Sequence, residues 1–394
     1  MESVEQKRNI ISTLWNDKEK RAVIIQIFSI AGLFALVWFM IGNAISNLDA
    51  LGKGFSFDFL FQPASYDINQ HLISYTSRDT HLRATIIGIM NTAMIAVAGI
   101  ILATVVGFTL GVLRLSKNFL INRIVYIYIE YIRNVPVLLH ILLVHGVVVH
   151  SLPNPKAAMT FNDSFFLTKR GFFMPSPDFE SAMTVVWIAL AIGIAFTFWF
   201  RRYAKRVQDE TGKIFPVFLI SFGAVVIFPV LVYFLAGSPI TWEIPVLKGF
   251  NFKGGMVVRP EFLALWLALS LYTAAFIAEI VRAGIIAVSH GQTEAAYALG
   301  LRPGRTTQLI VIPQALRVIV PPLTSQYLNL TKNSSLAIAI GYMDIVATIG
   351  GISLNQTGRE MECMIIVLAL YLIFSLSISS VMNWYNKRIK LVER

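Results

Sequence analysis

The chain has 394 residues, of which 56% are hydrophobic and only 14% are charged, and its mean hydropathy is +0.66. This composition lies far outside that of soluble domains and indicates a membrane protein. The excess of 33 Lys and Arg over 22 Asp and Glu does not point to nucleic acid as a partner, because these charges fall between apolar segments. The single cysteine cannot form an intrachain disulfide, and no Cys/His cluster has the spacing of a zinc site.

Eight apolar segments are long enough to cross a bilayer as helices, which takes roughly 20 residues each. The first follows a basic stretch, but its apolar run is longer than that of a cleaved signal peptide, so we expect it to be retained. The fold class predicted is therefore an all-α polytopic membrane protein. The expected spans are residues 22–43, 84–113, 123–150, 181–200, 215–236, 260–285, 314–340 and 360–385.

The distribution of basic residues predicts the orientation of these spans. Lys and Arg gather in residues 1–21, in the loop at 201–213 and in residues 387–394. Because cytoplasmic loops of membrane proteins are enriched in Lys and Arg, we expect these three segments and both termini in the cytoplasm. The aromatic- and proline-rich segments 44–83 and 151–180 then lie outside, where we expect ordered lids or a docking surface.

The third expected span carries polar residues that are costly in a membrane and therefore raise a functional hypothesis. Glu130 and Arg133 are three residues apart and can meet on one helix face. We favour a structural ion pair and keep a role in a translocation pathway as the alternative. Asn134 and Pro136 follow; they either shape such a pathway or only kink the helix, since proline interrupts the hydrogen-bond ladder.

Two further sets of ionisable residues are expected to have mainly structural roles. Glu279 and Arg282 in the sixth span repeat the three-residue spacing, so an ion pair is favoured and a pathway role for Glu279 is the alternative. His140, His145 and His150 recur every five residues, which rotates each about 140° from the last. They do not converge as metal ligands, and packing or interface roles are favoured.

A polar stretch, GQTEAAYALGLRPGRTTQLIVIP at 291–313, interrupts the apolar sequence on the side predicted to be cytoplasmic. Ser289 and Gln292 have capping-box spacing, so a helix can begin here. Gly300 can close that helix in the left-handed conformation, with Leu301 folding back on the preceding turn. Pro303 suits the first turn of the next helix. A short capped helix is predicted.

The same short helix has a surface that suits a groove on a partner protein. Ala295 and Ala296 form a small-residue face that permits close approach, and Glu294 places a negative charge near the positive helix N-terminus. An ordinary capped surface helix is the alternative when these residues are considered alone.

A polar cluster interrupts the seventh span after Pro321 and Pro322, where Lys332, Asn333, Ser334 and Ser335 follow one another; Lys332 has no partner at helical spacing. A broken helix is predicted here, which is tolerated at membrane depth only beside protein or a water-filled cavity. The Lys332 ammonium group could bind the carboxylate of a substrate, and the Asn and Ser side chains could bind the amino group of that substrate. The alternative is that the cluster is a gate or a packing element.

The spacing of residues along the polar stretch is more informative about function than its separate features. It resembles the signature EAA-x3-G-x9-I-x-L-P of ABC importer permeases and departs from it only by Ile312 in place of Leu. The matching residues are Glu294, Ala295, Ala296, Gly300, Ile310 and Pro313. In that family this segment is the coupling helix, which docks into a cytoplasmic ATPase.

The resemblance continues in TAMIAVAGIILATVVGFTLGVLRLS at 92–116, YIEYIRNVPVLLHILL at 128–143, the stretch 272–301 and IPQALRVIVPPLTSQYLNLTKNSSLA at 312–337. These segments are similar to the polar amino acid permease subfamily, whose type I core has five helices. The larger layout is most similar to permease subunits of general L-amino acid ABC importers of Gram-negative alphaproteobacteria.

The resemblance implies a division of the chain around the five-helix core. The expected parts are a cytoplasmic N-terminus (1–21), an extra span (22–43), a periplasmic segment (44–83), core helices 1 and 2 (84–150), an insertion with a periplasmic segment and two extra spans (151–258), core helices 3 to 5 (259–386) including the coupling helix (289–301), and a cytoplasmic tail (387–394).

The resemblance also implies the partners. These are a dimer of ATP-binding subunits, a second related permease that forms a heterodimer with this one, a periplasmic amino-acid-binding protein and the lipid bilayer of the bacterial inner membrane. The chain is then a transport subunit and not an enzyme, with no cofactor of its own. It has no G-x-x-x-x-G-K-[ST] motif, so ATP and magnesium are expected in the partner ATPase.

Two other functions are weighed against an ATP-driven importer. An ion-coupled secondary amino acid transporter would also have broken helices and charges in the membrane. It leaves the capped polar helix unexplained, however, and no internal repeat of spans is evident. A membrane-bound enzyme or sensor is disfavoured because no nucleophile–base constellation or soluble catalytic domain is recognisable.

Overall fold

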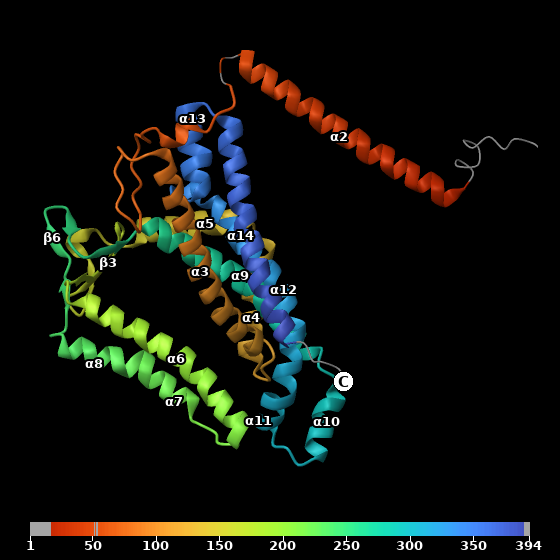
Figure 1. The fold of residues 1–394 in the computed structure, drawn as a ribbon, viewed down its shortest axis with the longest axis vertical. Helices are drawn as coiled ribbons and strands as arrows, with labels where there is room; N and C mark the ends of the chain where they lie inside the picture. Colours follow the sequence, from red (N-terminus) through yellow and green to blue (C-terminus); the bar gives the residue numbers. More distant parts are fainter. Residues whose placement is uncertain (1–16, 51, 53, 390–394) are drawn as a thin grey trace, which may run out of the picture.

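Long helices dominate the computed structural model, which describes residues 17–50, 52 and 54–389 (Figure 1). Among these residues, seven helices are long and apolar enough to cross a membrane, or eight if one bent pair counts as a span. The predicted helical, polytopic fold is confirmed. Most of the segment expected as a cytoplasmic N-terminus (1–21) and of the tail (387–394) lies outside the described residues.

The helices follow the chain in this order: α2 (Lys18–Ala50), α3 (His81–Leu113), α4 (Phe119–Asn134), α5 (Val137–Ser151), α6 (Met183–Thr211), α7 (Val217–Phe222), α8 (Phe228–Leu235), α9 (Pro260–Ile286), α10 (His290–Ala298), α11 (Pro303–Thr306), α12 (Ile312–Asn333), α13 (Leu354–Thr357) and α14 (Glu360–Ile389). Short 3₁₀ helices are η1 (Asp58–Phe61), η2 (Pro155–Ala157) and η5 (Ser334–Ile340). Segments of π-helix are η3 (Gly223–Ile227), η4 (Thr307–Val311) and η6 (Val346–Ser353).

The third expected span, 123–150, is not one continuous helix. It consists of α4 and α5, whose axes differ by 110°. Proline disfavours helical geometry in the residue before it and cannot donate a backbone hydrogen bond. Val135 accordingly has an extended backbone, with φ −112° and ψ 133°, and Pro136 caps the next helix. The proline thus turns the chain sharply instead of only kinking it.

Helix α9 lies at the centre of the bundle, packed against α3, α5 and α12. Glycines of α3 permit its close approach. A Cβ atom at Gly107 would lie 2.6 Å from the Cβ atom of Ile277, and one at Gly111 would lie 2.7 Å from the carbonyl oxygen of Ala278. Small residues at the contact allow two membrane helices to pack backbone to backbone, which fixes α9 as a rigid central element.

The first helix, α2, stands apart from the body of the structure (Figure 1), and none of its most apolar stretch is buried. The added pair of spans behaves differently, because α6 packs along α7, η3 and α8 as a hairpin. Gly193 of α6 faces the carbonyl group of Ala224 with no room for a Cβ atom. The hairpin is therefore held together by contacts between its own helices.

The insertion between α5 and α9 contains short strands that the sequence analysis does not predict. They are β1 (Met159–Phe161), β2 (Phe165–Thr168), β3 (Gly171–Met174), β4 (Ser176–Phe179), β5 (Ile240–Glu243), β6 (Val246–Lys248), β7 (Asn251–Lys253) and β8 (Met256–Val258). One antiparallel sheet has the order β1-β2-β3-β8, and β4-β5 and β6-β7 form two further pairs. Phe252 stacks on Phe166, with ring centroids 4.4 Å apart. The pairs β3–β8 and β4–β5 join the two loops of the insertion, which are separated in sequence by the α6–α8 hairpin.

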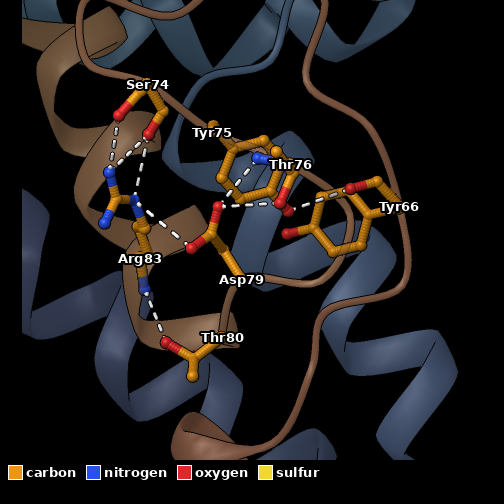
Figure 2. Close-up of polar contacts among 7 residues, drawn as sticks. All are labelled: Tyr66, Ser74, Tyr75, Thr76, Asp79, Thr80 and Arg83. Atoms are coloured by element: carbon orange, nitrogen blue, oxygen red, sulfur yellow. Dashed lines mark hydrogen bonds and ion pairs between the residues drawn. The ribbon is translucent and has the colours of Figure 1, made fainter.

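The segment before α3 is also ordered, and Figure 2 shows the contacts that hold it at the start of that helix. Thr80 caps α3 by accepting a hydrogen bond from the Arg83 N–H at 3.3 Å. The Arg83 guanidinium group donates to the Ser74 carbonyl oxygen and lies 3.7 Å from Asp79. The Tyr75 hydroxyl donates to the Tyr66 carbonyl oxygen at 2.9 Å, and burial raises the pKa of this phenol, which keeps it a neutral donor.

Candidate functional site

Helix α10 is separated from the insertion by the whole length of α9. Because α9 has 27 residues between β8 and α10, the two lie about 40 Å apart along its axis at 1.5 Å per residue. Figure 1 shows α10 at the same end of the molecule as the turn between α6 and α7. The segment expected as a basic loop at 201–213 is mostly helix, since α6 runs to Thr211, and its basic residues lie in the last turns of α6 and in the turn that follows. We call this end the α10 side and the opposite end the insertion side.

The start of α10 differs from the predicted capping box. Ser289 is the N-cap residue by its backbone, with φ −56° and ψ 133°, but its hydroxyl makes no capping hydrogen bond. The Gln292 side chain accepts instead from Gln314 of α12 at 3.3 Å. The expected reciprocal cap is therefore wrong, and Gln292 serves to tie α10 to the start of α12.

The end of α10 has the predicted glycine geometry. Gly300 has φ +76°, the Gly300 N–H donates to the Tyr297 carbonyl at 2.9 Å, and the Leu301 N–H donates to the Ala296 carbonyl at 3.0 Å. These two bonds define a Schellman motif, which needs a left-handed residue at this position. Pro303 then opens α11. The reversal of the chain after α10 is thus fixed by residues that the sequence identifies.

The exposed surface of α10 is broader than the predicted alanine face. Ala295 and Glu294 are exposed, whereas Ala296 is buried within the chain. Leu299 is 83% exposed and Tyr297 is 48% exposed, although both are apolar and lie at the tip of the bundle. These two exposed side chains on a short polar helix are available for contact with a partner protein. Neither residue is among those that the sequence motif identifies, although their place in the short polar helix was a readable signal.

The remaining residues of the motif connect α10 to the membrane. Ile310 lies in the π-helical segment η4, and Pro313 lies in the first turn of α12. Pro313 cannot donate the hydrogen bond that an α-helix would place on the Leu309 carbonyl, which favours a widened turn before it. Helices α10 and α12 are thereby joined through a short rigid connection rather than a free loop.

The two expected ion pairs have different outcomes. Arg282 Nε donates to both carboxylate oxygens of Glu279 at 3.1 Å, so this pair is confirmed. The pair between Glu130 and Arg133 is wrong. Asn134 Nδ2 donates to the Glu130 carbonyl at 2.7 Å and contacts its carboxylate at 3.4 Å, while the Arg133 guanidinium carbon lies 5.8 Å from the centroid of the Phe276 ring.

A cavity of about 280 Å³ lies between α9 and α12 and is lined mainly by polar side chains. We call it the α9–α12 cavity; it is defined by Tyr272, Thr273, Phe276, Gln326, Asn329 and Asn333. Asn333 is the one lining residue that the sequence analysis proposed. Gln326 and Asn329 were missed, although amides at positions i, i+3 and i+7 of an apolar span were a readable signal.

Of the polar cluster at the end of α12, only Asn333 lines this cavity. As predicted, the α-helix ends there, at Asn333, and continues as the 3₁₀ helix η5, whereas Pro321 and Pro322 lie inside α12. Ser334 Oγ donates to the Thr331 carbonyl and Ser335 Oγ to the Lys332 carbonyl, both at 2.7 Å. The two hydroxyls are thus occupied by the backbone. Lys332 is exposed on the surface of the chain.

The cavity adjoins the bend in the α4–α5 pair. Arg133 reaches its wall through Phe276, and the His140 ring lies 5.6 Å from the ring of Tyr272. Pro136 creates the bend that brings α5 beside α9, and the Pro136 carbonyl oxygen lies 3.2 Å from His140 Nδ1. The α9–α12 cavity therefore adjoins side chains of α4 and α5, and it is open on one side, where Asn329 is exposed.

The family model for binding-protein-dependent transport system inner membrane components matches residues 186–391, which include α10 and the α9–α12 cavity. The chain belongs to this family. This permease is similar over nearly its whole length to the general L-amino acid transport system permease protein AapQ of Rhizobium johnstonii. The identity is 46%, over 96% of this chain and 94% of AapQ.

Two further relatives match over similar lengths. The glutamate/glutamine/aspartate/asparagine transport system permease protein BztB of Rhodobacter capsulatus is 48% identical, over 98% of this permease and 97% of BztB. The putative amino-acid ABC transporter permease protein YhdX of Escherichia coli K12 is 44% identical, over 95% of each chain. A solved amino acid ABC transporter with histidines is 19% identical, with a TM-score of 0.46, and covers 78% of this permease and 95% of the solved chain.

Proposed function

We propose that the chain is the permease subunit of an ATP-driven, binding-protein-dependent importer of amino acids in the bacterial inner membrane, with a broad range of L-amino acids as substrates. A permease of this kind carries no nucleotide site and couples to a separate ATPase. The observation that carries the proposal is α10, a short helix with exposed apolar residues, closed by a Schellman motif and tied to α12.

The proposed orientation places the α10 side in the cytoplasm and the insertion side outside. Its support is that α10 lies at the same end of the bundle as the turn after α6 (Figure 1), beside which the basic residues of 201–213 gather, since basic residues that flank membrane spans stay on the cytoplasmic side. Both termini are then cytoplasmic, and the β-strand insertion can meet a periplasmic amino-acid-binding protein.

The proposed mechanism is alternating access. Closure of an ATPase dimer moves α10, whose end is held rigidly by Gly300 and whose start is tied to Gln314 of α12. Because α12 forms one wall of the α9–α12 cavity, this movement reaches the polar side chains Gln326 and Asn329. The amides and hydroxyls of that cavity have the hydrogen-bonding groups that bind the polar ends of an amino acid.

The proposed assembly contains two permease subunits, two ATP-binding subunits and a binding protein. The second permease is a related chain, so that the pathway forms between two unlike halves. ATP and magnesium bind in the ATPase subunits.

Affinity purification of the tagged chain in mild detergent, followed by mass spectrometry, tests the assembly. We expect an ATPase with a P-loop motif and a second permease in near-equal amounts. A matched purification with Leu299→Asp should retain the second permease and lose the ATPase, because the substitution places a charge on the exposed apolar tip of α10. Recovery of a lone transporter that works without ATP would support an ion-coupled carrier instead.

A further inference from the structure

A second polar cavity, of about 520 Å³, lies where the insertion meets the helix bundle. Its walls come from the β2–β3 turn, strand β7, the start of α9 and one face of α5, so it combines residues from the insertion and the core. We call it the junction cavity and define it by His145, Lys169, Arg170, Asn251, Arg259 and Glu261. It lies on the insertion side, at the opposite end of α9 from α10.

The backbone of the insertion brings its cations together. Strands β3 and β8 pair with Phe172 opposite Val258, and a Cβ atom at Gly171 would lie 2.6 Å from the Val258 carbonyl oxygen. Gly171 has φ +131°, a conformation that favours glycine. The close approach of these strands sets Arg170, which precedes Gly171, beside Arg259, which follows Val258.

The junction cavity carries an excess of positive charge that the described part of the chain does not neutralise. Three of its side chains are cationic and one, Glu261, is anionic, and none of the four forms an ion pair with a described residue. The N-terminus of the 27-residue helix α9 adds partial positive charge at Pro260. Three cations with one carboxylate suit a ligand that has more negative than positive groups.

Unsatisfied polar atoms in the same walls define the complementary groups of such a ligand. Arg259 Nε, a donor, and Asn251 Oδ1, an acceptor, are both buried without a hydrogen-bond partner. Buried polar groups are normally paired, so these two residues of the cavity lining each leave one polar atom without a partner, and a ligand that both accepts and donates complements them. A carboxylate accepts from a guanidinium group, and an ammonium group donates to an amide oxygen or to Glu261.

Helix α5 links the junction cavity to the α9–α12 cavity. His145 lines the junction cavity, and His140, about 7.5 Å earlier along the helix axis at 1.5 Å per residue, contacts the ring of Tyr272. Tyr272 in turn lines the α9–α12 cavity. The two cavities therefore both adjoin α5, but on different faces, since five residues turn the helix by about 140°.

We propose that the junction cavity is a binding site for a free amino acid, in which Arg259, Arg170 and Lys169 hold carboxylate groups and Asn251 and Glu261 hold the ammonium group. The excess of positive charge makes the site prefer an amino acid with two carboxylates over one with a side-chain amide. The proposal rests on the proposed function, because it places this site before the α9–α12 cavity on the route of import.

Equilibrium binding of radiolabelled L-glutamate and L-glutamine to the purified complex in nanodiscs, without the binding protein or ATP, tests the proposal. We expect tighter binding of glutamate than of glutamine. Arg259→Gln should weaken glutamate binding about tenfold, the effect of losing one charge-assisted hydrogen bond, and should weaken glutamine binding less. Lys253→Gln, a matched loss of charge at an exposed residue outside the cavity lining, should change neither.

A second variant covers the case in which Arg259→Gln does not assemble. Lys169 is exposed in the β2–β3 turn, so the Lys169→Gln variant should fold. It should still reduce the difference in binding affinity between glutamate and glutamine. Equal affinity for both ligands in the wild-type complex, or equal weakening of both by these variants, would overturn the proposal. So would unchanged ligand binding together with weaker capture of the binding protein, which would make the cavity a protein-docking site.

The binding measurement is independent of ATP. If glutamate binding responds to Arg259→Gln as expected while the complex fails to import amino acids with ATP, the site stands and the proposed importer function fails.

Discussion

Replacing Gly300 with valine perturbs the end of α10 through the backbone alone. Gly300 has φ +76°, and a Cβ atom built on it meets no atom within 4 Å, so no steric clash contributes. A left-handed conformation costs a residue other than glycine roughly 1–2 kcal/mol, and a β-branched side chain resists it further. A strain of this size shifts a local equilibrium by a factor of about 5–30.

The chain can relieve this strain only by giving up the Schellman motif. Its two hydrogen bonds, from Gly300 to Tyr297 and from Leu301 to Ala296, contribute about 0.5–1.5 kcal/mol each. Whether the strain is retained or the two hydrogen bonds are lost, the end of α10 becomes less stable and the membrane helices are unchanged. We therefore expect Gly300→Val to abolish most ATP-driven amino acid uptake while the complex still assembles.

The assay compares uptake into proteoliposomes with the amount of complex recovered by gel filtration. Gly304→Val is the matched control, because Gly304 lies in helix α11 without a positive φ and also has no atom within 4 Å of a built Cβ. The control should transport like the wild type. Wild-type uptake by Gly300→Val, or an equal loss in both variants, would refute the assigned coupling role.

Three other substitutions test the remaining features. Asn329→Leu removes an amide from the α9–α12 cavity and should lower uptake tenfold or more by loss of a polar contact, at normal assembly; unchanged uptake would remove the cavity from the pathway. Lys332→Met should impair uptake in an assembled complex if this exposed ammonium group serves the substrate, whereas loss of assembled complex in gel filtration would assign it to packing. Gly107→Val places a side chain against Ile277 and should destabilise the α3–α9 contact by about 1–3 kcal/mol, seen as a lower melting temperature in detergent; an unchanged melting temperature would contradict the close packing.

The sequence predicts the features that depend on local physics. Apolar length identifies the membrane helices, because crossing a bilayer requires it. Gly300 and Pro303 fix the end of α10 and the start of α11, because their backbone preferences act at their own positions. These elements agree with the structure.

Features that depend on packing could not be read in the same way. The spacing of Glu130 and Arg133 permits an ion pair, but Glu130 contacts Asn134 one turn further along α4, and Arg133 lies over Phe276 of α9, a contact that depends on the packing of α4 against α9. The strands of the insertion are only three or four residues long, so no local periodicity marks them. Two of their pairings, β3–β8 and β4–β5, also join residues across most of that segment. The junction cavity likewise joins residues more than 100 positions apart.

The most direct test of the account is uptake of labelled L-amino acids into proteoliposomes that contain the purified complex and its binding protein, with ATP or a non-hydrolysable analogue on the α10 side. The account predicts uptake that requires hydrolysable ATP and persists when ionophores abolish all ion gradients. Uptake driven by an ion gradient without ATP would contradict it.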